Sequence, residues 1–100
     1  MRLTKKMMKR MRQLIYEKFP TGTWTHQDEY WLARFTHFVN SEERDSNDQP
    51  YYWGYAYAGD KKYIFDFRVS RMLKDIKLFR IYCIDRDWDC TIWTCGQQQD

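Results

Sequence analysis

The sequence has few of the residues from which common small functional sites are built. Its four glycines are scattered, so there is no glycine-rich loop to hold a phosphate. The three cysteines lack the closely spaced pair of a zinc knuckle. No stretch approaches the roughly 20 apolar residues that a membrane-spanning helix requires. These absences predict a chain without a cofactor, a structural zinc ion or a membrane segment.

The cysteine pattern also indicates the cellular compartment. An odd number of cysteines without a disulfide pattern is typical of a reducing environment. The basic N-terminus has no apolar core of the kind that a signal peptide needs. We therefore expect a soluble cytoplasmic protein, and its 100 residues fit a single domain.

The net charge of +3 is distributed unevenly along the chain. Residues 1–19 carry seven basic side chains against Glu17, so the rest of the chain is net acidic. A basic segment on an acidic body suits an anionic partner. Direct nucleic-acid binding is therefore one alternative function, in which the basic segment and aromatic strands share the contact. Its candidate phosphate-binding residues are Lys5, Lys6, Lys9, Arg10 and Arg12.

The N-terminal third reads as one or two helices. Apolar residues in 3–19 recur at the spacing of an amphipathic helix, with Thr4 as a candidate cap and Pro20 as the stop. Its early lysines lie near the positive end of the helix dipole, where positive charge is unfavourable. A local preference violated in this way can indicate a functional surface. Residues 25–39 fit both a second helix and a strand, and the helix is slightly preferred. Residues 40–50 are polar and acidic, which predicts an exposed, mobile loop.

The C-terminal half reads as strands at 51–58, 62–69, 76–84 and 88–95, with a helical turn at 70–75. Both alternating faces of 76–84 are apolar, so we expect that strand to be central and covered on both sides. The predicted fold is α+β, with an N-terminal helix, and a possible second one, packed on a four-stranded, mostly antiparallel sheet.

The most informative segment is an aromatic hairpin. Two alternating runs flank Gly59-Asp60, and their rings are Tyr51, Tyr52, Trp53, Tyr55, Tyr57, Tyr63, Phe65 and Phe67. A two-residue turn would place Tyr51, Trp53, Tyr55 and Tyr57 on the face opposite Phe65 and Phe67. A three-residue turn would gather all these rings on one face as core. The first register predicts an aromatic binding platform, because that face is too polar at Asp66 and Arg68 for a dry core.

The leading functional hypothesis is a non-enzymatic protein that docks on a protein partner. Aromatic rings and arginine dominate protein interfaces, so the anchors would be Trp53, Tyr55, Tyr57 and Arg68. Charge complementarity to a basic partner would come from Glu42, Glu43, Asp45 and Asp48. In size, aromatic content and lack of catalytic motifs, the chain is similar to small orphan proteins of phages and mobile elements. That resemblance implies an inhibitor that occupies the surface of a host enzyme. The acidic residues suit a basic partner, including an enzyme whose basic groove normally holds nucleic acid.

Two further alternatives follow from the sequence. Asp75-Ile76-Lys77 matches the acidic-x-Lys element of metal-dependent nucleases, with Asp66 as second carboxylate and Glu17 or Glu29 as the early glutamate. The aromatic face could also be buried in a homodimer.

Overall fold

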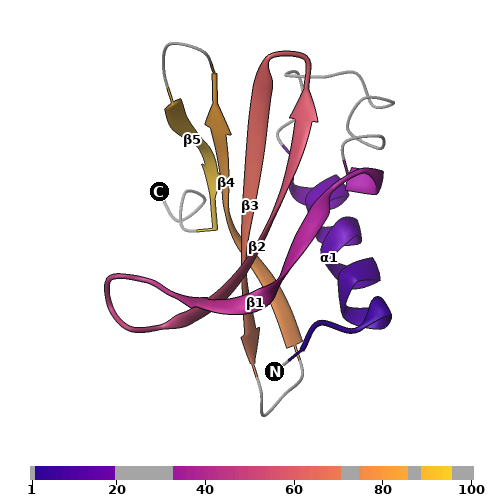
Figure 1. The fold of residues 1–100 in the computed structure, drawn as a ribbon, viewed down its shortest axis with the longest axis vertical. Helices are drawn as coiled ribbons and strands as arrows, with labels where there is room; N and C mark the ends of the chain where they lie inside the picture. Colours follow the sequence, from indigo (N-terminus) through magenta and orange to yellow (C-terminus); the bar gives the residue numbers. More distant parts are fainter. Residues whose placement is uncertain (1, 20–32, 71–74, 86–88, 96–100) are drawn as a thin grey trace.

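The computed structural model describes residues 2–19, 33–70, 75–85 and 89–95. Within these ranges the chain forms one helix and one antiparallel sheet with its strands in sequence order, β1-β2-β3-β4-β5 (Figure 1). The elements are α1 (Lys5–Lys18), β1 (His37–Arg44), β2 (Pro50–Ala58), β3 (Lys61–Ser70), β4 (Asp75–Ile84) and β5 (Asp89–Thr94). The predicted α+β class is confirmed, with five strands where the sequence predicted four.

Helix α1 forms where the apolar spacing predicted it. The Thr4 hydroxyl oxygen accepts a hydrogen bond from the Met7 N–H at 3.1 Å, which caps the first turn. At the other end the backbone turns extended at Phe19, one residue before Pro20. Met11, Leu14 and Ile15 are buried against the sheet, so α1 covers one of its faces.

The sheet face that α1 covers, called here the inner face, holds the core. Its largest side chains are less than 2% exposed and come from both the helix and the strands: Tyr52, Tyr63, Phe65, Phe67, Met11, Ile15 and Ile81. The rings sit opposite small residues of β2, since Gly54 pairs with Phe65 and Ala56 pairs with Tyr63. Large rings over small neighbours fill this layer without overpacking it.

The structure corrects the predictions for residues 25–50. Of the described residues in this region, Ala33 and Arg34 are helical and His37–Arg44 is strand β1, so residues 37–39 are not a second helix. Residues 25–32 lie outside the described part of the chain. Pairing with β2 overrides the local helical pattern, because it buries Phe38 opposite Gly54 on the inner face.

The predicted acidic loop at 40–50 is also wrong over half its length. Residues 40–44 continue β1 through an irregularity between Val39 and Glu43, and Pro50 opens β2. The turn between these strands is held by Asp45, whose carboxylate accepts the N–H groups of Asn47 and Gln49 at 2.9 Å each. This acidic segment is therefore the hydrogen-bonded end of a hairpin.

Strand β4 contains a bulge that its sequence pattern does not reveal. Asp66 pairs with Arg80 and Phe67 with Leu78, which leaves Phe79 as the extra residue. The bulge shifts the alternation, so that Leu78 and Ile81 both face the core. The other face of β4 is not sealed, since Ile84 is exposed, and the prediction of a strand covered on both sides is wrong. Of the predicted helical turn at 70–75, Ser70 and Asp75 are strand residues and 71–74 lie outside the described ranges.

Candidate functional site

The face of the sheet turned away from α1, called here the outer face, gathers the candidate anchors. The pairing of Ala58 with Lys61 makes Gly59-Asp60 a two-residue turn, and Gly59 takes the left-handed conformation that such a turn uses (φ 63°). Of the two registers that the sequence left open, the structure has the one that divides the rings between faces. The side chains that share the outer face are Tyr51, Trp53, Tyr55, Tyr57, Lys62, Ile64, Asp66, Arg68, Arg80, Tyr82 and Ile84.

The rings of β2 form a row along this face. Trp53 and Tyr55 have their centroids 5.7 Å apart, and Tyr55 and Tyr57 are 5.8 Å apart. His37 of β1 extends the row sideways, 5.3 Å from Tyr55. Tyr57 is 66% exposed and His37 is also exposed, whereas Trp53 and Tyr55 are half-buried. The row therefore presents a continuous aromatic strip.

Cations from β3 and β4 lie over the outer rings. The Lys62 ammonium is 4.8 Å from the centroid of Tyr55 and 5.8 Å from that of Tyr57. The Arg80 guanidinium is 5.1 Å from the centroid of Tyr82. Each contact is worth about 0.5–1 kcal/mol at an exposed site. The outer face thus combines aromatic area with fixed positive charge, the side-chain chemistry that dominates protein-binding hot spots.

A buried carboxylate holds one of these cations in place. Asp66 is 3% exposed, and its Oδ2 accepts a hydrogen bond from Arg80 Nε at 2.8 Å. Burial raises the pKa of Asp66, and the charge of Arg80 and its hydrogen bond partly oppose that rise. Burial, followed by the negative charge of Asp66, also raises the pKa of Tyr51, whose ring meets Phe79 edge to face at 6.4 Å. The buried carboxylate of Asp66 therefore holds the Arg80 guanidinium in position.

Arg68 lies on the outer face as predicted, but its guanidinium already has partners. It donates to the Pro50 carbonyl oxygen at 3.0 Å, forms an ion pair with Asp45, and lies 4.6 Å from the centroid of Phe79. The hydrogen bond from Arg68 is the main reason that the pKa of Asp45 is lowered. Arg68 thus positions the acidic turn against the sheet.

The other predicted acidic residues belong to the same hairpin end. Arg44 lies 3.8 Å from the carboxylate of Glu42 and 4.0 Å from that of Asp48. Glu43 is exposed, and Asp48 is at the tip of the turn with a left-handed backbone (φ 60°). Together with Asp45, three of the four predicted carboxylates are therefore close to arginines of the chain itself.

Sequence reasoning missed part of this surface. Lys62 could have been placed there from strand alternation once the turn was known. Arg80 and Phe79 could not, because their positions depend on the β4 bulge.

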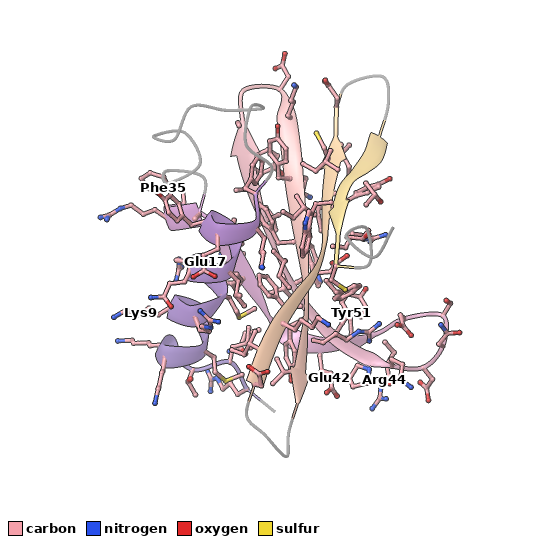
Figure 2. The ribbon with its side chains drawn as sticks, turned by 180° about the vertical axis from the view of Figure 1, so that it is seen from behind. Lys9, Glu17, Phe35, Glu42, Arg44 and Tyr51 are labelled. Atoms are coloured by element: carbon pink, nitrogen blue, oxygen red, sulfur yellow. The ribbon has the colours of Figure 1, made fainter. Side chains whose placement is uncertain are left out.

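The basic residues of α1 lie on the other side of the molecule. Lys9, Glu17 and Phe35 point away from the sheet on the helix side, and Tyr51, Glu42 and Arg44 lie on the opposite side (Figure 2). Four of the five predicted phosphate-binding residues are exposed, namely Lys5, Lys6, Lys9 and Arg10. Arg12 is half-buried, 4.9 Å from the centroid of Phe38. The basic helix and the aromatic strip therefore do not line one surface.

A shallow groove of about 710 Å³ runs between α1 and the helical residues Ala33 and Arg34. Its described cationic lining comes from Lys9, Arg12 and Arg34, with Tyr16 beside them and Glu17 as the one carboxylate among the described lining residues. Glu17 also lies 3.9 Å from Arg10. The helix side of the molecule is thus strongly basic.

The predicted nuclease residues are not brought together. Asp66 is paired with Arg80, five residues along β4 from Asp75, which corresponds to roughly 16 Å. The Asp75 carboxylate accepts the N–H of Ile76 at 2.9 Å, and Glu29 lies outside the described residues. Within the described residues, no three His, Cys, Asp or Glu side chains gather as a metal ion would require.

Taken together, the fold and this surface define a small α+β domain with one helix-covered and one open aromatic sheet face. No helix in the described ranges has both the length and the apolar character needed to cross a bilayer. No protein-family model, no curated protein and no solved structure matches the chain.

Proposed function

We propose that the protein acts by binding rather than by catalysis, and that it docks on a protein partner through its outer face. The observation that carries this proposal is the row of Trp53, Tyr55 and Tyr57 with Lys62 and Arg80 beside it. Tryptophan, tyrosine and arginine are the residues most enriched in binding hot spots. Their positions are held by mutual ring contacts and by the Asp66 ion pair, so little side-chain entropy remains to be lost on binding.

The same arrangement favours a protein partner over unpaired bases. Base stacking needs open ring faces, and on this face the rings contact one another or lie under a cation. A protein partner can instead use ring edges, hydroxyl groups and the guanidinium.

The acidic end of the β1–β2 hairpin indicates which charge the partner should carry. Glu42, Glu43 and Asp48 lie on the β1–β2 hairpin, next to the outer face. A basic rim on the partner would complement them. More specifically, we infer that the protein is an inhibitor of the phage or mobile-element kind. It would cover the basic groove of a host enzyme that handles nucleic acid. The exposed thiol of Cys95 supports a reducing, cytoplasmic location.

Affinity capture from a host lysate, followed by quantitative mass spectrometry, tests the docking surface. The bait is the full chain, and the test variant is Trp53→Ala/Tyr57→Ala. We expect the variant to lose at least tenfold of one captured protein, because hot-spot truncations each cost about 2 kcal/mol or more.

Phe35→Ala is the matched control, since Phe35 is 68% exposed but lies on the helix side (Figure 2). Circular dichroism and urea midpoints establish that each variant is folded. Equal capture by all three proteins would contradict the proposal. Sedimentation that shows a dimer for the wild type and a monomer for Trp53→Ala/Tyr57→Ala would instead assign the face to self-association.

A second candidate function rests on the other side of the molecule. The exposed lysines of α1 and the groove lined by Lys9, Arg12 and Arg34 suit the phosphates of a nucleic acid. Mobility shifts at several salt concentrations, with duplex and single-stranded DNA, test this candidate. Replacing Lys5 and Lys6 with glutamine should lower the salt slope by about one for each lysine. No shift at low salt, or equal weakening by Trp53→Ala/Tyr57→Ala, would remove it.

A further inference from the structure

Strand β4 is paired along its whole length on one side but only along part of it on the other. Its first half, Asp75 to Leu78, pairs with β3. In the part of the chain that the structure describes, β5 pairs with β4 from Arg80 onward, and the Cys95 N–H donates to the Phe79 carbonyl oxygen at 3.1 Å just beyond that register. Within the described residues, the first half of β4 is therefore an open sheet edge.

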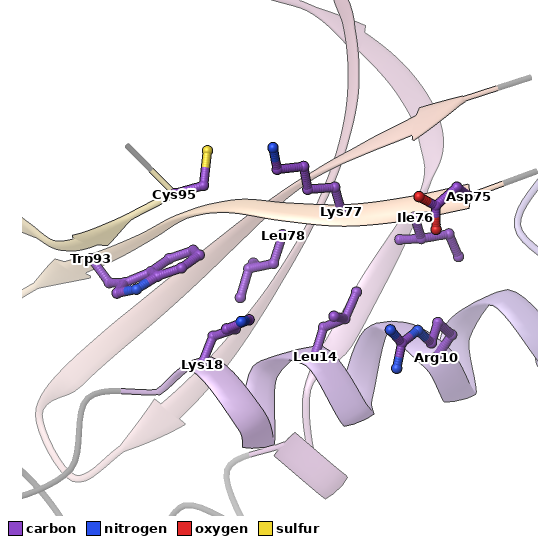
Figure 3. A pocket seen from close by; sticks show the side chains of 9 residues that line it. All are labelled: Arg10, Leu14, Lys18, Asp75, Ile76, Lys77, Leu78, Trp93 and Cys95. Carbon is purple, nitrogen blue, oxygen red and sulfur yellow. The ribbon is translucent and has the colours of Figure 1, made fainter. Parts of the chain in front are cut away.

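A groove of about 290 Å³ lies directly beneath that edge, between β4 and α1 (Figure 3). Its floor is apolar: Ile76 and Leu78 point down from β4 toward Leu14 of α1, and Trp93 of β5 closes one end. An open strand edge beside an apolar pocket is how sheets accept an added strand, since the edge supplies backbone hydrogen bonds and the pocket takes alternate side chains.

The charges around the groove indicate which kind of peptide could bind as the added strand. Arg10 and Lys18 rise from α1, and Lys77 points to the other side of β4 (Figure 3). Among the lining residues that the structure describes, Asp75 is the one carboxylate. Arg10 lies 3.9 Å from Glu17, but both side chains are about half exposed, so this pair is weak. Three cations against one carboxylate complement a peptide with acidic side chains.

We propose that the edge of β4 and the groove beneath it bind an extended acidic peptide of a protein partner as a sixth strand. The peptide lies end to end with β5 and pairs with residues 75–78. On the side that faces α1, one apolar side chain enters the pocket over Leu14 and Leu78, and carboxylates two residues before and after it lie toward Arg10 and Lys18. A carboxylate on the opposite side of the peptide lies toward Lys77. This surface is separate from the aromatic row, so its test does not depend on the docking function proposed above.

Amide hydrogen exchange and ¹⁵N chemical-shift titration of the full chain test this inference. The probe is a blocked eight-residue peptide in which one valine has a glutamate two residues before it and another two residues after it, with a further glutamate next to the valine and threonine elsewhere. Two comparison peptides carry lysine in place of glutamate, or N-methyl groups on alternate backbone amides. The Ile76 N–H bonds the Asp75 carboxylate and not β3, so by alternation the Leu78 N–H also points to the open edge. We expect the glutamate peptide to slow exchange at Leu78, and the other two to bind at least tenfold more weakly, because they lose the charge match or the backbone bonds.

Variants of α1 supply the matched control. Arg10→Glu/Lys18→Glu should weaken the glutamate peptide about tenfold, as expected when two attractive pairs become repulsive. Lys5→Glu/Lys6→Glu changes the net charge equally but lies outside the groove lining, so it should weaken binding less than twofold. Circular dichroism checks that both variants retain α1.

Four results would overturn the proposal. The first is slow exchange at Leu78 in the protein alone, since the edge would then already be covered. The others are equal binding of the N-methylated peptide, equal weakening by the two α1 variants, and displacement of the peptide by a single-stranded oligonucleotide at the same amides.

Discussion

The two faces of the sheet are built from the same kinds of side chain, yet one is core and the other is surface. The inner face carries Tyr52, Tyr63, Phe65 and Phe67, each no more than 1% exposed. The outer face carries Tyr51, Trp53, Tyr55 and Tyr57, none of them fully buried. The number of rings is therefore no guide to burial in this sheet.

Their neighbours make the difference. The inner rings face the apolar side of α1 and share their layer with Gly54 and Ala56. The outer rings share theirs with Lys62 and Arg80, and charged groups resist complete removal from water. Substitutions on each face test this contrast, and they are described from the largest expected effect to the smallest.

The largest effect is expected from Phe67→Ala on the inner face. Phe67 is fully buried and its ring lies 5.9 Å from that of Phe38, so truncation leaves a cavity that should cost about 3–5 kcal/mol. Tyr57→Ala on the outer face should change stability by less than about 0.5 kcal/mol. Urea denaturation of both variants measures the difference, and Phe67→Leu gives a milder variant if Phe67→Ala does not fold. Similar losses from the two alanine variants would refute the contrast between faces.

The next effect is expected at the ion pair beneath the outer face. Arg80→Met keeps an apolar chain over Tyr82 but leaves Asp66 buried without its cation. The cost should be about 2–3 kcal/mol at pH 7, less than for a fully buried pair because the Arg80 side chain is 43% exposed.

This cost should depend on pH, with a definite sign. Burial raises the pKa of Asp66 above its unfolded value of 3.8. Between the unfolded and the folded pKa of Asp66, the folded state holds a proton that the unfolded state has lost. The contribution of Asp66 to the free energy of unfolding therefore falls as the pH rises through this window. Removing Arg80, which opposes the rise, should widen the window. The difference between Arg80→Met and wild type should therefore shrink below about pH 4; a difference independent of pH would show that the Asp66 charge is not responsible.

A smaller loss is expected where two strands approach closely. A methyl group at Gly54 would lie 2.7 Å from Cδ1 of Phe38 and 2.9 Å from the carbonyl oxygen of His37. The backbone atom cannot move away without shifting β1, so Gly54→Ala should cost about 1–3 kcal/mol. Ala56→Gly on the same face removes a methyl group without crowding and serves as the comparison in thermal denaturation. A neutral Gly54→Ala would mean that β1 can shift freely.

The smallest effect is expected at Asp45, and its pH dependence is opposite to that of Asp66. The hydrogen bond from Arg68 lowers the pKa of Asp45, so its stabilising contribution is present above the unfolded value of 3.8 and is lost as the pH falls toward the folded value. Asp45→Asn should remove that dependence. Asp48→Asn is the matched control at the tip of the same turn, because asparagine tolerates a left-handed backbone. Urea midpoints between pH 3 and pH 7 should separate the two variants.

Much of the fold could be predicted because its signals are local. The apolar spacing of α1, the Thr4 cap and the Gly59-Asp60 turn each act within a few residues. Strand β1 could not be predicted in the same way, because its polar residues are held by pairing with β2. The same distinction applies to the candidate surface. The face on which Trp53, Tyr55 and Tyr57 lie is predicted by strand alternation, whereas the face of Phe79 depends on a bulge.

By itself, the amino-acid sequence determined the α+β class, the basic amphipathic helix and the aromatic hairpin, since periodicity and turn chemistry are properties of short segments. Only the tertiary structure decided which rings are covered, that Arg68 and Asp45 pair with each other, and that the basic helix and the aromatic row lie on opposite sides. Those features depend on strand register and on where α1 packs, which are set by contacts between residues far apart in the chain.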